Sequence, residues 1–432
     1  MASLSAAGLS LIETKIDSYT TKENGIPGLV FIAVNRNGER LVNHASGLRG
    51  LGSVESMTTD STFWMASCTK LVTSIAAMQL VEAKKLSLDD ADIVETIAPE
   101  LKKIQVLELT LDGSLHLVEK RGRITLRMLL THTAGFGYSF LNPKLKKWSE
   151  PIGLAEYSCL NYDIFTQPLV NHPGERWEYG VNLDWVGLLV ERVTRMSLGD
   201  YFRKFIFDPL GIQNIGFFPT TAMKEKLVYL HDRLSDGKVD IRQDGHLYRR
   251  PLVAQGKEDM KDIVNSGGAG LFSNPEDFCE IIATLINDGF HHKTGNRILR
   301  SGTVDDAMLY SDEGCHLEMF SNQIPQFPDF GRALPISSPK PYLTHAEAEL
   351  YPQPHQQPQG WGLSFFYLVH SSPTGRSAGS GFWSGLANLI WWVDRTQGVG
   401  GLIASQMLPF GDHDVWKCES EVEHILYQNL SH

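Results

Sequence analysis

A serine three residues ahead of a lysine is the arrangement in this sequence with the clearest chemical potential. Ser67 and Lys70 lie in FWMASCTKLVTSIAAMQLVE, with apolar residues on both sides. Residues three apart share one helix face, so the hydroxyl and the amine are within reach of each other. A serine needs a base to attack at neutral pH, and a desolvated lysine has a lowered pKa that suits this task. The free N–H groups of a helix start can also stabilise an oxyanion.

The spacing alone is weak evidence, because Ser235/Lys238 and Ser337/Lys340 repeat it. Both of these pairs lie in loop-like sequence, one containing a glycine and the other a proline. Only the first pair leads into a long apolar helix. The alternative for that pair is a serine that caps the helix and a lysine on the surface of its first turn.

A second candidate group is in HPGERWEYGVNLDWVG, residues 172–187. Tyr179 directly precedes a predicted helix capped near Asn182, so its hydroxyl is held at the end of a rigid element. Next to a lysine, such a phenol can act as a general base or a proton relay. The alternative is a core tyrosine whose hydroxyl is satisfied.

A third group, GSGFWSGLANLIWWVD, surrounds Trp383 with small residues on a predicted strand. Glycines allow a substrate to approach a strand closely, and an exposed strand N–H can complete an oxyanion hole. Alternatively, the glycines serve only twist and packing. His132 in LLTHTAGFG is expected to be a structural, hydrogen-bonding histidine, and GGAGLFSNPEDF offers no nucleophile.

Both ends of the chain predict parts of one sheet. Apolar periodicity predicts a helix over 5–22, and two β-rich runs follow it with a hairpin turn at 35–38. Near the other end, GWGLSFFYLVH, GFWSGLANLIWWVD and GVGGLIASQML each predict a strand, and a closing helix starts near Asp412 or Asp414. We therefore predict an α/β (α+β) fold with an antiparallel sheet of about five strands and terminal helices on one face.

The segment between these ends is mainly helical. We predict a discontinuous α/β lobe from residues 1–60 and 360–432, and an inserted helical lobe from 61–359. A small hairpin is expected near 104–124, and the Pro- and Gln-rich stretch 322–359 is expected to be a long loop bordering a cleft. A cleft between lobes is the default place for a site.

Composition excludes several classes of function. A net charge of −11 gives no attraction to nucleic acid or to an anionic membrane surface. Five scattered cysteines without a CxxC pair predict neither a disulfide framework nor a metal site, and we expect no cofactor. The first residues lack a signal-peptide pattern and no run is long enough to span a membrane, so we expect a cytoplasmic protein.

Together these segments resemble the serine β-lactamase and penicillin-binding-protein superfamily. SCTK, LLTHTAG, HPGERWEY, GGAGLFS and the strand with WSG occur in the family's order, across roughly residues 8–425. The branch they most resemble contains the class C-like (family VIII) esterases and the fungal lovastatin-type acyltransferases. The resemblance implies a β-lactamase/transpeptidase-like fold.

The resemblance also implies roles for individual residues. Ser67 is the expected acylated nucleophile, Lys70 its activator and Tyr179 the general base or proton relay. The backbone N–H groups of Ser67 and Leu386 are the expected oxyanion hole. The expected substrate-binding residues are Trp383, Ser384, Gly385, Asn182 and Trp361.

Two departures from the family pattern affect the expected activity. The third motif, usually Lys-Thr-Gly in β-lactamases, is Trp-Ser-Gly here, so a charge that would bind a β-lactam carboxylate is missing. The tyrosine motif, often Tyr-x-Asn, has its asparagine displaced to Asn182. Efficient β-lactam hydrolysis is therefore not expected.

The function predicted is serine-dependent acyl transfer through an acyl-enzyme, by an acyltransferase or carboxylesterase of secondary metabolism. Its expected partners are a small-molecule acyl donor with an apolar acyl group, with a carrier-bound thioester as one candidate, and a small-molecule acceptor. A β-lactam hydrolase and a non-catalytic binding protein on the same fold are the alternatives. The sequence identifies neither donor nor acceptor, and neither the balance between hydrolysis and transfer nor the oligomeric state.

Overall fold

The computed structural model describes residues 2–304, 319–332, 338–345 and 356–431. Its largest sheet has the strand order β11-β12-β13-β14-β15-β2-β3, and all neighbours are antiparallel. In chain order these strands are β2 (Gly28–Asn35), β3 (Arg40–Gly47), β11 (Gly360–Trp361), β12 (Phe366–Tyr367), β13 (Gly381–Gly385), β14 (Leu389–Asp394) and β15 (Val399–Ala404). Both ends of the chain thus build the sheet, as predicted. It has more strands than the five expected, because GWGLSFFYLVH and GFWSGLANLIWWVD, each predicted as one strand, each form a pair of antiparallel strands, β11 with β12 and β13 with β14.

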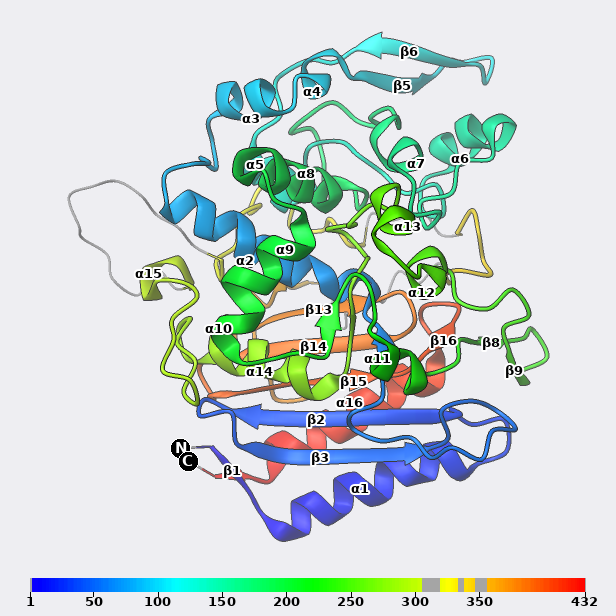
Figure 1. Ribbon diagram of the computed structural model, residues 1–432, viewed down its shortest axis with the longest axis vertical. Coiled ribbons are helices and arrows are strands. Elements are labelled where there is room, and N and C mark those ends of the chain that lie inside the picture. Colours follow the sequence, from blue (N-terminus) through cyan, green and yellow to red (C-terminus); the bar gives the residue numbers. More distant parts are fainter. Residues whose placement is uncertain (1, 305–318, 333–337, 346–355, 432) are drawn as a thin grey trace.

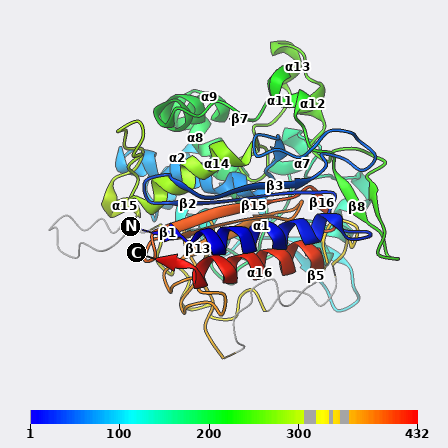
Figure 2. The same ribbon diagram turned by 90° about the horizontal axis from the view of Figure 1, so that it is seen from below.

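Strands β2 and β15 are neighbours in this sheet and join the two ends of the chain. Ile32 lies opposite Leu402, and every residue of both strands is buried. Helices α1 (Ala6–Thr21) and α16 (His413–Gln428) lie side by side on one face, while α14 (Pro275–Ile286) covers the other (Figures 1 and 2). A sheet covered on both faces is a rigid platform, which explains the continuous apolar runs in its strands.

The two terminal helices begin at side-chain caps. The Ser5 hydroxyl accepts a hydrogen bond from the Gly8 N–H at 3.0 Å and starts α1. The Asp412 carboxylate accepts from the N–H groups of Asp414 and Val415, both at 3.1 Å, and starts α16. Such caps satisfy N–H groups that the first turn leaves free. The predicted starts of both helices are confirmed.

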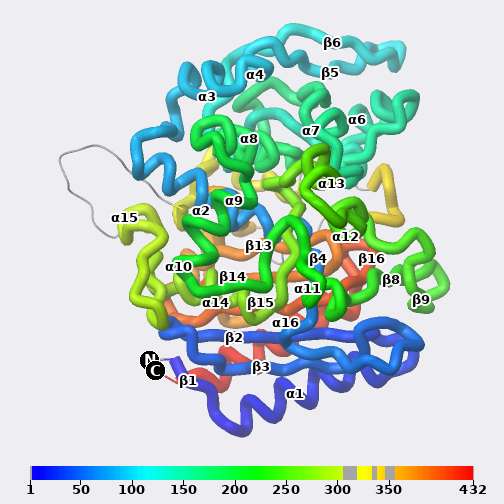
Figure 3. Tube along the Cα trace, viewed as in Figure 1, coloured from blue at the N-terminus to red at the C-terminus, as the bar shows by residue number. Residues whose placement is uncertain are grey.

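The middle of the chain is mainly helical and lies above the sheet in the view of Figure 3. Helix α2 (Thr69–Glu82) runs through it and packs against α8 (Asn182–Thr194). The other helices are α3 (Ala91–Ile97), α4 (Glu100–Lys103), α5 (Leu126–Leu130), α6 (Pro143–Ser149), α7 (Asn161–Phe165), α9 (Leu198–Phe202), α10 (Asp208–Leu210), α11 (Thr221–Glu225), α12 (Arg250–Val253), α13 (Lys257–Lys261) and α15 (Ser301–Val304). Turns of other helix types are η1 (Ala66–Cys68), η2 (Glu150–Ile152) and η3 (Arg203–Phe207).

Smaller sheets complete the fold. Their strands are β1 (Ser3–Leu4), β4 (Phe63–Trp64), β5 (Gln105–Leu109), β6 (Leu115–Glu119), β7 (Ile215–Gly216), β8 (His231–Arg233), β9 (Val239–Ile241), β10 (Phe272–Ser273), β16 (Met407–Leu408) and β17 (Leu430–Ser431). Strands β5 and β6 form the hairpin that was predicted near 104–124. Within the part of the chain that the structure describes, no helix is long and apolar enough to cross a membrane.

The prediction of one strand over GWGLSFFYLVH is wrong. The chain reverses between β11 and β12, where the Gly362 N–H donates to the Phe365 carbonyl at 2.8 Å. Ser364 has a φ of +83°, a left-handed conformation that ends an extended strand. The aromatic and branched residues of this run therefore pair with one another across a tight turn.

Candidate active site

The serine of the first S-x-x-K pair lies on a tight turn just before α2. Strand β4 pairs with β10, and the Met65 N–H donates to the Leu271 carbonyl at 2.8 Å, so the chain enters this turn along a fixed path. Ala66 has a φ of +44°, which is uncommon for a residue with a side chain. Strained residues of this kind gather at functional sites. The turn leaves Ser67 on the wall of a pocket.

The lysine of the pair is fully buried, and three oxygens surround its amine. Lys70 Nζ donates to Ser67 Oγ at 3.0 Å, to the Gly268 carbonyl at 2.7 Å and to the Tyr138 hydroxyl at 3.3 Å. Burial lowers the pKa of Lys70 to about 7, although the charge of Asp184 acts in the opposite direction. The amine is thus close to half neutral at neutral pH, which is the state that can accept a proton from the serine.

The alternative interpretation of this pair, a serine that caps the helix and a lysine on the surface, is wrong. Lys70 is a core residue rather than a surface residue. Neither η1 nor α2 has a side-chain cap, so the hydroxyl of Ser67 does not cap the helix. Its partner is the lysine amine.

Tyr179 also lies beside the amine. Lys70 Nζ is 4.7 Å from the centroid of the tyrosine ring, and the Tyr179 hydroxyl accepts a hydrogen bond from Trp383 Nε1 at 2.8 Å. Burial raises the pKa of Tyr179, while hydrogen bonding with Ser67 and Trp383 lowers it less. The phenol is therefore neutral at physiological pH, a state suited to relaying a proton. Helix α8 begins at Asn182, but Val181 occupies the cap position, so the predicted cap near Asn182 is displaced by one residue.

Strand β13 brings the third motif, Trp383-Ser384-Gly385, against the turn that carries Ser67, called the nucleophile turn below. A Cβ on Gly385 would lie 2.7 Å from the Met65 carbonyl oxygen, so only glycine allows this approach. Trp383 and Ser384 line the pocket, and Leu386, in the turn after β13, lines it as well. The structure thus brings Ser67, Trp383, Ser384 and Leu386 to one pocket, while Gly385 packs against the turn that carries Ser67.

Two residues predicted to bind substrate lie outside the described pocket wall. Asn182 is fully buried, and its amide nitrogen contacts His132 Nδ1 at 2.9 Å. Trp361 is also fully buried; its indole N–H donates to the Leu130 carbonyl at 3.2 Å and its ring packs against Trp383. Neither side chain is part of the described pocket lining, so direct substrate contact by either residue stays a prediction. His132 is the buried, hydrogen-bonded histidine that was expected.

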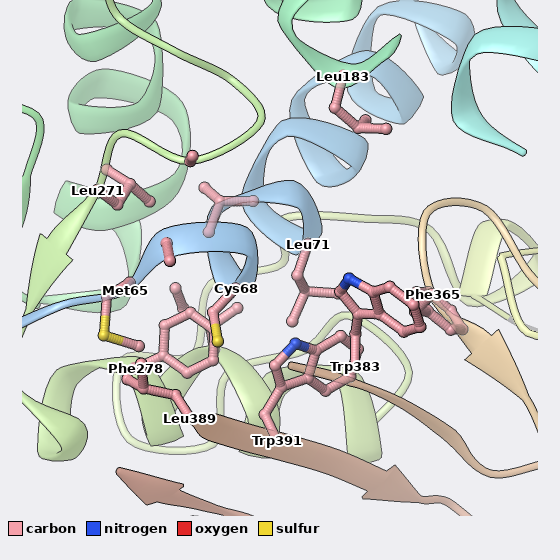
Figure 4. Close-up of a cluster of buried hydrophobic side chains, with 14 of the residues drawn as sticks. Met65, Cys68, Leu71, Leu183, Leu271, Phe278, Phe365, Trp383, Leu389 and Trp391 are labelled. Carbon is pink, nitrogen blue, oxygen red and sulfur yellow. The ribbon is translucent and has the colours of Figure 1, made fainter. Parts of the chain in front are cut away.

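Cys68, next to the nucleophile, faces the protein interior. Figure 4 shows it in the apolar cluster between the start of α2 and the sheet, near Phe278 and Leu389. Burial raises the pKa of its thiol, so the thiol stays protonated and unreactive.

Three residues that touch or face the lysine were missed from the sequence. Tyr138 follows LLTHTAGFG directly, Gly268 lies in GGAG, and Asp184 lies five residues after Tyr179. The first two motifs were noted, but no spacing rule connects them to Lys70. The Gly268 contact is made by a backbone carbonyl, which leaves no trace in residue type.

The pocket above Ser67 is aromatic and uncharged. It encloses about 620 Å³ of space that no atom occupies, open solvent included. Thr344 contributes to it, so part of the stretch 322–359 borders the site, although residues 333–337 and 346–355 lie outside the described chain. Its described lining contains no charged side chain and comprises Ser67, Phe140, Leu141, Tyr157, Trp177, Tyr179, Thr344, Phe382, Trp383, Ser384, Leu386, Phe410 and Trp416.

No group of side chains suited to a metal ion occurs in the part of the chain that the structure describes. The chemistry that the geometry supports is carried by the protein's own groups. A hydroxyl, an amine with a lowered pKa and a neutral phenol meet beside an apolar pocket. This combination is typical of nucleophilic acyl transfer.

Comparison with known proteins agrees with this chemistry. Residues 12–416 match the Beta-lactamase family. A lovastatin esterase of Penicillium rubens is 32% identical over 94% of this chain and 95% of its own. A monacolin J acid methylbutanoyltransferase of Aspergillus terreus is 30% identical over 99% of this chain and 97% of its own. A mutant of the simvastatin synthase LovD from Aspergillus terreus superposes with a TM-score of 0.78 at 27% identity, covering 98% of this chain and 95% of that one.

Proposed function

The chain belongs to the Beta-lactamase family, as a hydrolase or acyltransferase related to fungal enzymes of secondary metabolism, and we propose that it acylates Ser67 with an apolar acyl group. The observation that carries this proposal is the 3.0 Å contact between Lys70 Nζ and Ser67 Oγ at the edge of an uncharged pocket. The acyl group then passes to a small alcohol or to water.

In the proposed acylation step, neutral Lys70 takes the proton of the Ser67 hydroxyl as Oγ attacks the acyl carbon. The negative charge that develops on the carbonyl oxygen is placed at the backbone N–H groups of Ser67 and Leu386. Tyr179 passes the proton from Lys70 to the leaving alkoxide or thiolate, which departs as alcohol or thiol. The Trp383 indole N–H holds the Tyr179 hydroxyl in place for this transfer.

The second step reverses the proton path. An acceptor hydroxyl loses its proton through Tyr179 to Lys70 and attacks the acyl carbon, and Ser67 leaves with its proton restored. An alcohol acceptor yields a new ester, and water yields the free acid. The same groups serve both steps because each returns to its starting protonation state.

The pocket supports a substrate class. Aromatic rings line it without a charged group, so a carboxylate in the acyl portion would lose its hydration without gaining a partner. The two fungal relatives are named for lovastatin and for a methylbutanoyl group on monacolin J acid. We place a compact aliphatic acyl group in this pocket, delivered as a small-molecule ester or a carrier-bound thioester in the cytoplasm.

Intact-mass spectrometry tests the proposal. The protein is incubated with p-nitrophenyl esters of increasing chain length and with matching acyl thioesters, and the adduct mass identifies the accepted acyl group. Adding candidate alcohols then separates transfer from hydrolysis by product analysis. We expect an adduct on Ser67 and none in Ser67→Ala.

Two outcomes would contradict the proposal. Well-folded protein that neither forms an adduct nor reacts with a serine-directed fluorophosphonate would favour a non-catalytic binding protein. Efficient hydrolysis of nitrocefin would favour a β-lactam hydrolase. We expect at most slow nitrocefin turnover, because no charged side chain lines the described pocket to bind its carboxylate.

A further inference from the structure

Asp184 is a buried carboxylate that lies behind the pocket and outside its lining. It is on α8, is 3% exposed and does not border the cavity. Its Oδ1 accepts hydrogen bonds from Ser266 Oγ at 2.5 Å and from the Gly268 N–H at 3.1 Å. A buried carboxylate is costly unless it is hydrogen-bonded, so Asp184 depends on these two donors.

The turn that Asp184 holds, residues 266–270, also carries the shortest hydrogen bond of the catalytic lysine. Gly268 donates its N–H to Asp184 and receives Lys70 Nζ on its carbonyl at 2.7 Å. The other side of the turn is held by α2, where Thr73 Oγ1 donates to the Gly267 carbonyl at 2.7 Å. A Cβ on Gly268 would lie 2.4 Å from Asp184 Oδ2, so the turn and the carboxylate fit each other closely.

We propose that Asp184 is a positioning residue for the acyl-transfer reaction, acting through the Gly268 peptide and through its charge on the amine of Lys70. This inference rests on the function proposed above. The Gly268 peptide connects the two side chains: its N–H is bound by Asp184 and its C=O by Lys70. Displacing that peptide would leave the amine free to turn away from Ser67.

The charge of Asp184 has a second effect on the lysine. An ionised carboxylate nearby favours the ammonium form, so it holds the pKa of Lys70 higher than burial alone would. The ionisable groups that interact with either partner are Cys68, His132, Tyr138, Tyr157, Tyr179 and Tyr248. Burial keeps the thiol and the phenols protonated, and it lowers the pKa of His132 so that the imidazole stays neutral. Burial raises the pKa of Asp184 as well, while the Ser266 hydroxyl, the charge of Lys70 and the Gly268 N–H lower it. Asp184 in its ionised form is thus the anion that acts on the amine.

Two substitutions separate position from charge. Asp184→Asn keeps an oxygen for the Ser266 and Gly268 bonds but removes the charge, so the pKa of Lys70 falls. The acid limb of the acylation rate should then move to lower pH by about one unit. Asp184→Ala removes the hydrogen bonds as well, and kcat should fall about 100-fold with an unchanged KM.

The matched control is Glu191→Gln on the same helix. Glu191 is also a mostly buried carboxylate that accepts a backbone N–H, from Leu198 at 2.8 Å. Its other hydrogen-bond partner is Asn265, which precedes the turn, and its charge does not act on the lysine. Its substitution should leave the acid limb in place. Acylation by p-nitrophenyl butyrate is followed by stopped-flow release of p-nitrophenolate between pH 5 and pH 9, with circular dichroism to verify folding.

The outcomes distinguish this inference from the proposed function. If wild-type protein forms no adduct on Ser67, the proposed function itself fails. If wild type is acylated and folded Asp184→Asn keeps the wild-type acid limb, the inference is overturned and the function stands. A raised KM with unchanged kcat in Asp184→Ala would also overturn it. Should Asp184→Ala not fold, the Asp184→Asn profile decides.

Discussion

The pairs Ser67/Lys70 and Ser235/Lys238 have the same residue types at the same spacing and opposite surroundings. Lys70 is fully buried and donates to Ser67, whereas the Lys238 side chain is 69% exposed and pairs with Asp236 at 3.1 Å. The second pair occupies the turn between β8 and β9, where Gly237 has a φ of +84° and the chain cannot form a helix. The S-x-x-K spacing therefore gives a reactive pair only where the fold buries the lysine and lowers its pKa.

Removing the two serines gives the largest expected contrast. Ser67→Ala should lower turnover of p-nitrophenyl butyrate by about 10⁴-fold or more, because no nucleophile remains to carry the acyl group. Ser235→Ala should retain wild-type turnover. Intact mass and initial rates measure both. Full activity in Ser67→Ala would contradict the assignment of Ser67, rather than Ser235, as the nucleophile.

Removing the two lysines comes next. Lys70→Met should lower the acylation rate about 1,000-fold, since the proton of Ser67 then has no acceptor. Lys238→Met, at an exposed site, should leave the rate unchanged. Stopped-flow rates of p-nitrophenolate release measure both variants. Equal losses in the two variants would show that the rate responds to net charge rather than to the base.

The approach of β13 to the nucleophile turn provides a smaller contrast between two glycines. Gly385→Ala puts a Cβ against the Met65 carbonyl and should lower kcat about 100-fold by moving Ser67. Gly216→Ala, in β7, meets no atom within 4 Å and should be nearly neutral. Rates at saturating ester, together with melting temperatures, separate displacement from unfolding. A Gly385→Ala enzyme with wild-type kcat would show that the turn is held by other contacts.

The pH dependence gives the most gradual effect. The amine of Lys70 must be neutral to accept a proton, and its pKa is about 7. The acylation rate should therefore be constant above about pH 8 and fall about tenfold per unit well below pH 7, as the ammonium form takes over. An acid limb near the ordinary lysine range, above pH 9, would contradict a desolvated base.

Local sequence patterns predicted much of the secondary structure of this protein. The buried runs around β2, β14 and β15 predicted the sheet because side chains covered on both faces must be apolar. Apolar periodicity predicted α1, and Asp412 marked the start of α16 because a cap acts on N–H groups a few residues away. Local rules did not predict the turn at Ser364, because the residue type of a serine does not reveal a left-handed backbone conformation.

The sequence by itself determined the reactive groups and the order of the motifs that carry them. Only the tertiary structure decided that Tyr138, the Gly268 carbonyl and Asp184 surround Lys70, and that Asn182 and Trp361 lie behind the pocket wall. These contacts join segments far apart in the chain, and one is made by a backbone atom that every residue type possesses. Desolvation is likewise a property of the packed interior, so the lowered pKa of the lysine belongs to the fold.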